Sequence, residues 1–237
     1  MPSGDGLVPR APDKLRPGQL GVVMLGRVII GDIAVTLADL AVRQFLAVRE
    51  QGDYHEPGGA QTDWSLTAVQ AAGLAHRRES LLGYERALLD AVTGSSQETV
   101  SSLAPRMTQI LAHTRREILH DAVRNGWLRH IRHDQRTDEG EQLAARIRTF
   151  QIQLRHFATS HGEEILAGPL LPYAMHFGLV HGDDLPLARF ARHWVREFSV
   201  LPGWHQEQPK APDPLTEPMP VDNTSGFHGL MGYYPAM

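Results

Sequence analysis

Two short stretches, GDIAVTLADLAVRQFL at residues 31–46 and DAVRNGWL at residues 121–128, decide the fold. In each stretch a helical pattern ends in Ala-Val-Arg, and an aromatic residue followed by Leu opens a run typical of a strand. Residues 40–46 read like residues 121–128 with one residue inserted. Helix, helix and a short hairpin is the order of elements in a winged helix-turn-helix unit, so the repeat predicts two such units in tandem. A match this short can also arise by chance.

Helical spacing dominates the rest of the chain. Apolar residues recur at intervals of three and four over residues 81–92, 103–119, 143–165 and 187–198, and a shorter helix is expected near residues 173–179. Strands are expected at residues 45–49, 64–69 and 127–132. The sequence therefore predicts a mainly α fold with a minor β component. Its expected parts are a flexible N-terminal tail (residues 1–15), a first winged-helix-like unit (16–77), a second one (78–135), a C-terminal helical segment (136–204) and a Pro- and Gly-rich tail (205–237).

Composition narrows the class of protein. The chain has 237 residues, 42% of them hydrophobic, no cysteine and a formal net charge of −4. The absence of cysteine excludes a disulfide-stapled scaffold, a cysteine-ligated metal and a thiol nucleophile. The most apolar stretch, residues 20–46, is interrupted by four charged residues, and residues 1–12 lack the basic start and apolar core of a signal peptide. We therefore expect no membrane insertion and a cytoplasmic location.

Three segments resemble a known bacterial family. Residues 31–43, residues 136–140 (RTDEG) and, most specifically, residues 171–179 (LPYAMHFGL) are similar to the cytosolic C-terminal region of the YciQ-like predicted membrane proteins. The similarity covers about residues 16–204, but the chain shows neither the membrane helices nor the N-terminal module of those proteins, and Phe177 replaces their usual aliphatic residue. The resemblance implies an architecture and a role as a cytosolic adaptor or regulator. It implies no catalytic residues, because the family is a domain of unknown function.

Charge is distributed unevenly along the chain. Residues 103–160 carry a net charge of +4, whereas residues 1–102 carry −3 and residues 161–237 carry −5. Because clustered arginines contact phosphates, the basic middle is a candidate nucleic-acid interface. A solvated helix face that pairs with acidic groups explains the same pattern. The candidate DNA-binding residues are Arg115, Arg116 and Arg124 on the expected recognition helix, and Arg129, Arg132 and Arg136 on the wing.

Histidines suggest a second kind of site. His113, Glu117 and His120 fall at i, i+4 and i+7 of one expected helix, and the Glu-x-x-His spacing occurs in carboxylate-bridged metal sites. His156 and His161, with Glu164 nearby, lie toward the end of the next helix. If those two faces packed together, the five residues His113, Glu117, His120, His156 and His161 could bind a divalent metal; surface histidines without a ligand are the alternative.

Catalytic templates are missing from the sequence: it has no Gly-x-Ser-x-Gly elbow, Walker loop or His-Glu-x-x-His. We therefore expect a non-enzymatic cytoplasmic adaptor without a cofactor, which binds a protein or peptide through winged-helix surfaces. The alternatives are a DNA-binding transcriptional regulator that uses the Arg-rich second unit and contacts duplex DNA, and a metal-dependent enzyme that uses the His/Glu helix face. The sequence leaves homo-oligomerisation open.

Overall fold

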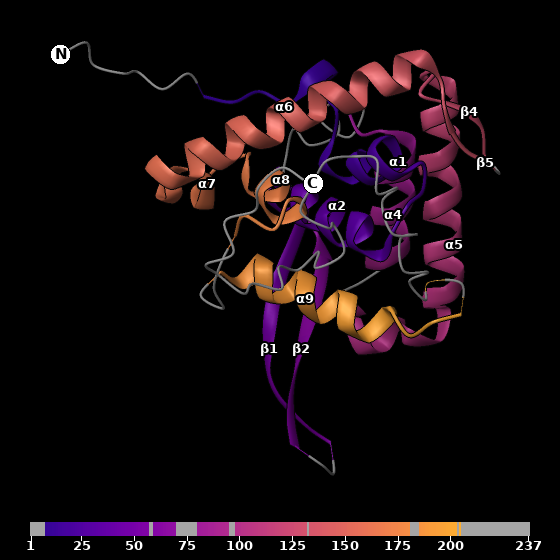
Figure 1. The fold of residues 1–237 in the computed structure, drawn as a ribbon. Helices are drawn as coiled ribbons and strands as arrows, with labels where there is room; N and C mark the ends of the chain where they lie inside the picture. Colours follow the sequence, from indigo (N-terminus) through magenta and orange to yellow (C-terminus); the bar gives the residue numbers. More distant parts are fainter. Residues whose placement is uncertain are drawn as a thin grey trace.

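The structure is a computed structural model that describes residues 8–56, 59–69, 80–94, 98–131, 133–180, 185–202 and 204. It is mainly helical with a minor antiparallel component, which confirms the predicted fold class (Figure 1). Within these residues the elements are η1 (Pro12–Lys14), η2 (Pro17–Gln19), α1 (Leu20–Leu25), α2 (Ile30–Val42), β1 (Leu46–Glu56), β2 (Gly59–Ala68), α4 (Gly83–Thr93), β3 (Glu98–Thr99), α5 (Val100–Arg124), β4 (Leu128–His130), β5 (His133–Arg136), α6 (Asp138–Ser160), α7 (Gly162–Ala167), α8 (Leu171–His176) and α9 (Pro186–Phe198).

Two helices followed by an antiparallel hairpin occur twice in this order. The first set is α1, α2 and the hairpin β1–β2, and the second is α4, α5 and the hairpin β4–β5. β3 joins the first hairpin by pairing with β2, which gives a sheet of order β1-β2-β3. The buried apolar residues of both sets belong to one cluster that runs from Leu15 to Trp204.

The same turn links the second helix to the hairpin in both sets. The amide of Phe45 donates to the carbonyl of Leu40 at 2.8 Å, and the amide of Trp127 donates to the carbonyl of Ala122 at 2.9 Å. These are the bonds of a Schellman motif, whose left-handed position is Gln44 (φ 63°) in one set and Gly126 (φ 73°) in the other.

The structurally equivalent positions of the two turns are 82 residues apart. Phe45 then matches Trp127 and Asp39 matches Asp121, with no inserted residue. The sequence alignment placed an insertion here because it matched the letters Ala-Val-Arg rather than the turn geometry. The two Ala-Val-Arg segments in fact lie one position out of phase within their helices.

Helix α2 lies at the centre of the fold. Of its thirteen residues, the eleven from Ile30 to Leu40 are buried. Helices α8 and α9 and the short η2 pack around it, and α9 adds a run of aromatic contacts. In that run the ring centroids of Trp64 and Phe190 are 5.7 Å apart, and those of Trp194 and Phe198 are 4.8 Å apart. A helix buried on all sides is mostly apolar, and the buried polar side chains of α2 are Asp32, Thr36 and Asp39.

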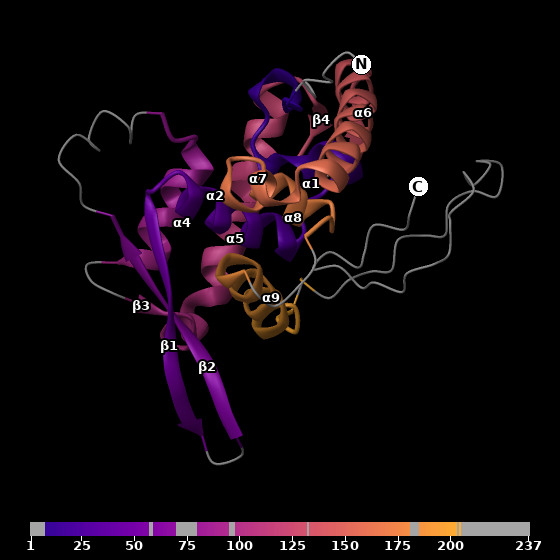
Figure 2. The same cartoon turned by 90° about the vertical axis from the view of Figure 1, so that its left-hand side faces the viewer.

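The expected elements differ from the structure mainly at their ends. The helix predicted over residues 143–165 is two helices, α6 and α7, which meet at His161. The strand predicted over residues 127–132 is β4 alone, and β5 was missed because its sequence, HDQR, has no strand signature. Strand β1 continues well past residue 49, so the first hairpin extends away from the helices (Figures 1 and 2). None of the described helices is both long and apolar enough to span a membrane.

Candidate functional site

The hairpin β1–β2 is anchored to the helices at its base. Asp63 on β2 accepts a hydrogen bond from the hydroxyl of Ser101 at 2.5 Å and one from the amide of Trp64 at 2.8 Å. Burial alone raises the pKa of Asp63, but these hydrogen bonds outweigh it and hold the pKa below its usual value. Across the sheet, Arg189 of α9 donates to Glu50 at 2.6 Å. The first turns of α5 and α9 therefore fix the base of the hairpin.

Beyond this base the hairpin has little support. β3 pairs only with Ser65 and Leu66, whereas β1 and β2 continue to pair with each other as far as Glu56 and Gly59. Among the described residues, β1 has no strand neighbour other than β2. Within the described ranges, the backbone N–H and C=O groups along the outer edge of β1 therefore have no strand partner.

The six arginines proposed to contact DNA are in different environments. The side chain of Arg116 is exposed on α5 and donates to His113 Nδ1 at 3.0 Å, and that of Arg124 is 65% exposed and contacts Asp121 at 3.3 Å. Arg129 is exposed on β4, while Arg132 lies outside the described residues. Arg115 is half-buried, with its guanidinium carbon 5.6 Å from the ring centroid of Trp204.

Arg136 is bound to the backbone of another element rather than exposed to solvent. Its Nη1 donates to the carbonyl of Met24 at 2.6 Å and also contacts that of Val23, both at the end of α1, and its Nε donates to Glu141 at 2.7 Å. These bonds satisfy carbonyls that have no partner within a short helix. Arg136 therefore links β5 to α1.

The residues proposed to bind metal lie on two separate elements. His113, Glu117 and His120 are on α5, whereas His156 and His161 lie at the far end of α6, beside α7 (Figure 1). No three His, Asp or Glu side chains form a metal-binding group among the residues described, and the side chain of Glu164 is outside them. The structure thus does not bring the two predicted sets together.

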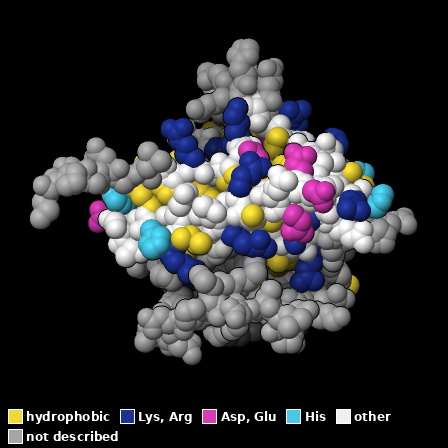
Figure 3. Space-filling model, turned by 45° about the horizontal axis from the view of Figure 1, so that its top comes forward, with side chains coloured by type: hydrophobic (Ala, Val, Ile, Leu, Met, Phe, Trp, Pro, Cys, Tyr) yellow, Lys and Arg dark blue, Asp and Glu magenta, His cyan; other side chains and the backbone are white. Residues whose placement is uncertain are grey.

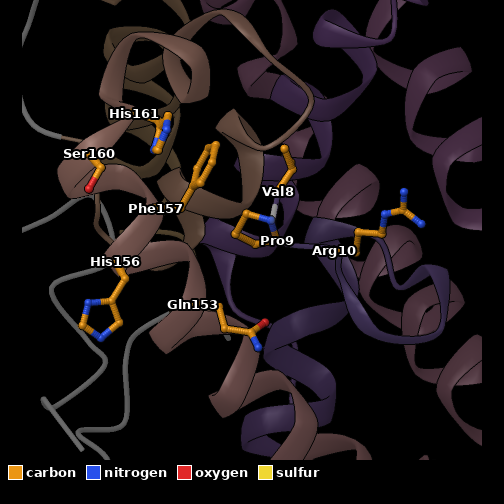
Figure 4. A pocket seen from close by; sticks show the side chains of 8 residues that line it. All are labelled: Val8, Pro9, Arg10, Gln153, His156, Phe157, Ser160 and His161. Atoms are coloured by element: carbon orange, nitrogen blue, oxygen red, sulfur yellow. The ribbon is translucent and has the colours of Figure 1, made fainter. Parts of the chain in front are cut away.

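A groove of about 900 Å³ lies between the N-terminal segment and the end of α6 (Figure 4). The rings of Phe157 and His161 stack there with centroids 4.5 Å apart and face Pro9, while His156 and Arg10 lie on opposite sides of the groove. Basic and acidic side chains are interspersed over the face that carries α6 (Figure 3). Polar groups do not converge in this groove as they do in a preorganised ligand site.

Two buried ionisable pairs were missed from the sequence. His176 Nδ1 of α8 lies 3.5 Å from Asp32 Oδ1 of α2, and both side chains are fully buried. Burial raises the pKa of Asp32 to about 8, against hydrogen bonds from the amides of Ile29 and Gly21, and lowers the pKa of His176 to about 3. Both shifts have the same cause: burial favours the uncharged carboxyl of Asp32 and the uncharged imidazole of His176.

The second pair joins the two helix–helix–hairpin sets. Arg43 Nη1 lies 2.7 Å from Glu85 Oε1 of α4 and 2.8 Å from Asp39 Oδ2, and Glu85 is fully buried. Burial alone lowers the pKa of Arg43, but the two carboxylates outweigh it and raise that pKa. Asp39, Arg43 and Asp32 interrupt the longest apolar stretch of the sequence, and that interruption was the available signal of buried polar contacts.

No protein-family model, curated protein or solved structure matches this chain. The resemblance to the YciQ-like family therefore stays a prediction.

Proposed function

We propose that the protein is a non-enzymatic cytoplasmic binding module of tandem winged-helix-like type, in which the edge of the hairpin β1–β2 takes up an extended segment of a protein partner. The observation that carries the proposal is the pairing of the ribbon: β3 covers two residues of β2, and among the described residues β1 pairs with no strand other than β2. The base of the same ribbon is held by Asp63–Ser101 and Glu50–Arg189.

The physical argument concerns the stability of the ribbon. A two-stranded ribbon on its own is marginally stable in water, and an open edge is a template for a further strand. A partner strand added to β1 would satisfy the free backbone groups, as in β-augmentation. The anchored base would give the added strand a fixed direction relative to α9.

A shortened hairpin tests the proposal. Gln51 and Asp63 face each other in the register, so residues 52–62 can be replaced by Asn-Gly, which forms a two-residue turn. This variant keeps Glu50, Asp63 and Trp64 and therefore the base of the hairpin. Val200→Ser, at a 67% exposed site outside the hairpin, is the control.

The measurement is chemical crosslinking of the purified full chain in lysate of the source cells, compared among the three proteins. We expect a crosslinked partner that the wild type and the Val200→Ser variant share and the shortened hairpin loses, with thermal unfolding unchanged. A partner that all three proteins capture equally contradicts a role for the hairpin edge.

We propose duplex DNA as a second candidate partner, because Arg116 and Arg124 are exposed on α5 and Arg129 is exposed on the adjoining strand. Fluorescence anisotropy with a labelled 20-base-pair duplex tests it at several salt concentrations. Each lost phosphate contact reduces the slope of log affinity against log salt by about 0.9, so Arg116→Ala with Arg124→Ala reduces it by about 1.8. Arg148→Ala, an exposed change on α6, leaves the slope unchanged if α5 is the interface. Equal slopes for all variants contradict this candidate.

A further inference from the structure

Helix α6 exposes one whole side to solvent. Its apolar residues are buried on the side that faces α1, and the helix lies along the outside of the molecule (Figures 1 and 2). The opposite side carries residues at alternating intervals of four and three, which is the spacing along which two helices pack in a coiled coil. We call this set the outer seam, and all seven of its residues are exposed: Asp138, Gln142, Ala145, Thr149, Ile152, His156 and Thr159.

The middle of the outer seam suits close packing against a second helix. Ala145 and Thr149 have small side chains, whereas Ile152 is a large apolar side chain that is 53% exposed. Large side chains pack well opposite small ones. In an antiparallel pair of α6 helices centred on Thr149, Ile152 of each helix lies opposite Ala145 of the other.

The charge of α6 is self-complementary. Three carboxylates give residues 138–141 a net charge of −3, and three arginines without any carboxylate give residues 142–160 a net charge of +3. The helix dipole favours acidic groups in the first turn, but no basic residue lies in the last turn, where the dipole would favour one. A parallel pair of α6 helices would bring like charges together. An antiparallel pair brings the acidic start of each helix to the basic half of the other.

Basic groups at the far end of α6 are available for such a contact. Arg148 and Arg155 are exposed and form no ion pair within the described part of the chain. Arg10 and His156 lie on opposite sides of the groove at that end, and the eight described residues that line the groove include no acidic side chain (Figure 4). This end of α6 therefore complements the charge of residues 138–141.

We propose that the protein forms a homodimer in which the outer seams of two α6 helices pack antiparallel, with Thr149 of both copies at the two-fold axis. Gln142 of each copy then lies opposite the partner's His156. The contact involves one helix from each copy, so the interface is small and the dimer dissociates reversibly. The proposal does not depend on the hairpin function. Because α6 and the hairpin β1–β2 lie at opposite ends of the molecule (Figures 1 and 2), the dimer presents two hairpins.

Single cysteine variants of the full-length chain test the arrangement, because the native sequence has no cysteine. Gln142 and Thr149 are seven residues apart, or about 10.5 Å along the helix. In the antiparallel dimer the two copies of position 142 are therefore about 21 Å apart, well beyond the roughly 7 Å between Cα atoms that a disulfide allows. Position 142 instead lies beside position 156 of the partner. The control is Val200→Cys, at a 67% exposed site outside α6.

We expect a mixture of the Gln142→Cys and His156→Cys proteins to form an intermolecular disulfide at least about tenfold faster than two other samples, as residues held together require. These samples are the Gln142→Cys protein alone and its mixture with the Val200→Cys protein. Equal rates in all three samples overturn the dimer. Fastest linkage of the Gln142→Cys protein to itself overturns the antiparallel direction.

Sedimentation equilibrium gives an independent measurement. We expect the wild type to dimerise reversibly and Ile152→Asp to raise the dissociation constant at least about tenfold, because a carboxylate would be buried in the interface without a partner. Val200→Asp, the matched change outside α6, should leave the dissociation constant unchanged, and 0.5 M NaCl should raise it by screening the charges. A wild type that stays monomeric at every concentration overturns the proposal, as does a dimer that Ile152→Asp does not weaken.

Discussion

The carboxylate of Glu85 in α4 is fully buried, and its Oε1 lies 2.7 Å from Nη1 of Arg43 at the end of α2. The other oxygen of Glu85 accepts a hydrogen bond from the amide of Leu82 at the start of α4. One side chain thus both caps its own helix and fixes the helix of the other set. This contact gives the clearest energetic test of how the two helix–helix–hairpin sets are held together.

Glu85→Gln should destabilise the protein strongly, because it removes one partner of a buried ion pair and leaves the other charge partly uncompensated. Losses of this kind are about 3–5 kcal/mol. The matched control is Asp13→Asn, which breaks the ion pair with Arg146 at 2.6 Å, where both side chains are about half exposed; that loss should be about 0–1 kcal/mol. Urea unfolding monitored by tryptophan fluorescence measures both. Equal losses would show that Glu85 and Arg43 contribute no more than a surface pair.

The two Schellman turns predict opposite effects for two glycine substitutions. Gln44 is held at φ 63°, so Gln44→Gly should stabilise the protein, whereas Gly126→Ala at φ 73° should destabilise it, each by about 1 kcal/mol. The measurement is the thermal midpoint of each single variant against the wild type. A fall for Gln44→Gly would mean that the glutamine side chain contributes more than the left-handed backbone costs.

The pair Asp32–His176 predicts a specific pH dependence. The pKa of Asp32 is raised to about 8, so its contribution is fully present below the unfolded value near 4 and is lost as pH rises through 8. The lowered pKa of His176, about 3, acts in the other direction: stability rises with pH from about 3 up to the unfolded value of 6.5. Between about pH 4 and 6.5 the fall in unfolding free energy caused by Asp32 cancels the rise caused by His176. The net loss of unfolding free energy therefore falls between pH 6.5 and 8 and amounts to about 2 kcal/mol.

The variant Asp32→Asn tests whether Asp32 is the group that titrates between pH 6.5 and 8. The amide keeps an oxygen that can accept from the amide of Ile29, but it does not titrate. We expect the difference in unfolding free energy between variant and wild type to change by about 2 kcal/mol between pH 6.5 and 8 and to stay level if Asp32 is not the group that titrates. Urea titrations at half-unit pH steps measure it.

The variants Arg136→Ala and Arg129→Ala compare an arginine with structural contacts and an arginine on the surface. Arg136→Ala should lower stability by about 1.5–3 kcal/mol, because it removes charged hydrogen bonds to the end of α1, while Arg129→Ala should change it by less than about 0.5 kcal/mol. Differential scanning calorimetry of the two variants checks this. A neutral Arg136→Ala would indicate that solvent replaces the bonds to Met24 and Val23.

The sequence predicted the fold well where local rules determine the structure. Periodicity located α4, α5, α8 and α9, and the prolines and glycines that end helices located their limits within a few residues. The prediction was wrong at His161, where one apolar stripe continues from Phe157 to Ile165 across a break between α6 and α7. An apolar stripe indicates only which side of a helix faces the core. Two successive helices that meet at an angle can carry one continuous stripe.

The site was harder to predict, because it depends on contacts between residues far apart in the chain. Arg136 has the charge expected of a wing arginine, but its partners are carbonyls 112 and 113 residues earlier. Nothing in the local sequence of Arg136 distinguishes it from the exposed Arg129. His176 is likewise one of thirteen histidines in the sequence, and only the packing of α8 on α2 places it against Asp32.

The central position of α2 has a consequence for synthesis of the chain. Its residues from Ile30 to Leu40 are buried on every side, yet two of the helices that cover it, α8 and α9, begin at residues 171 and 186. While the ribosome is still making the second helix–helix–hairpin set, the apolar surface of α2 has no complete cover. A nascent chain of this kind presents a binding site to chaperones until its last helix emerges, so fragments that stop before Phe198 should aggregate during expression.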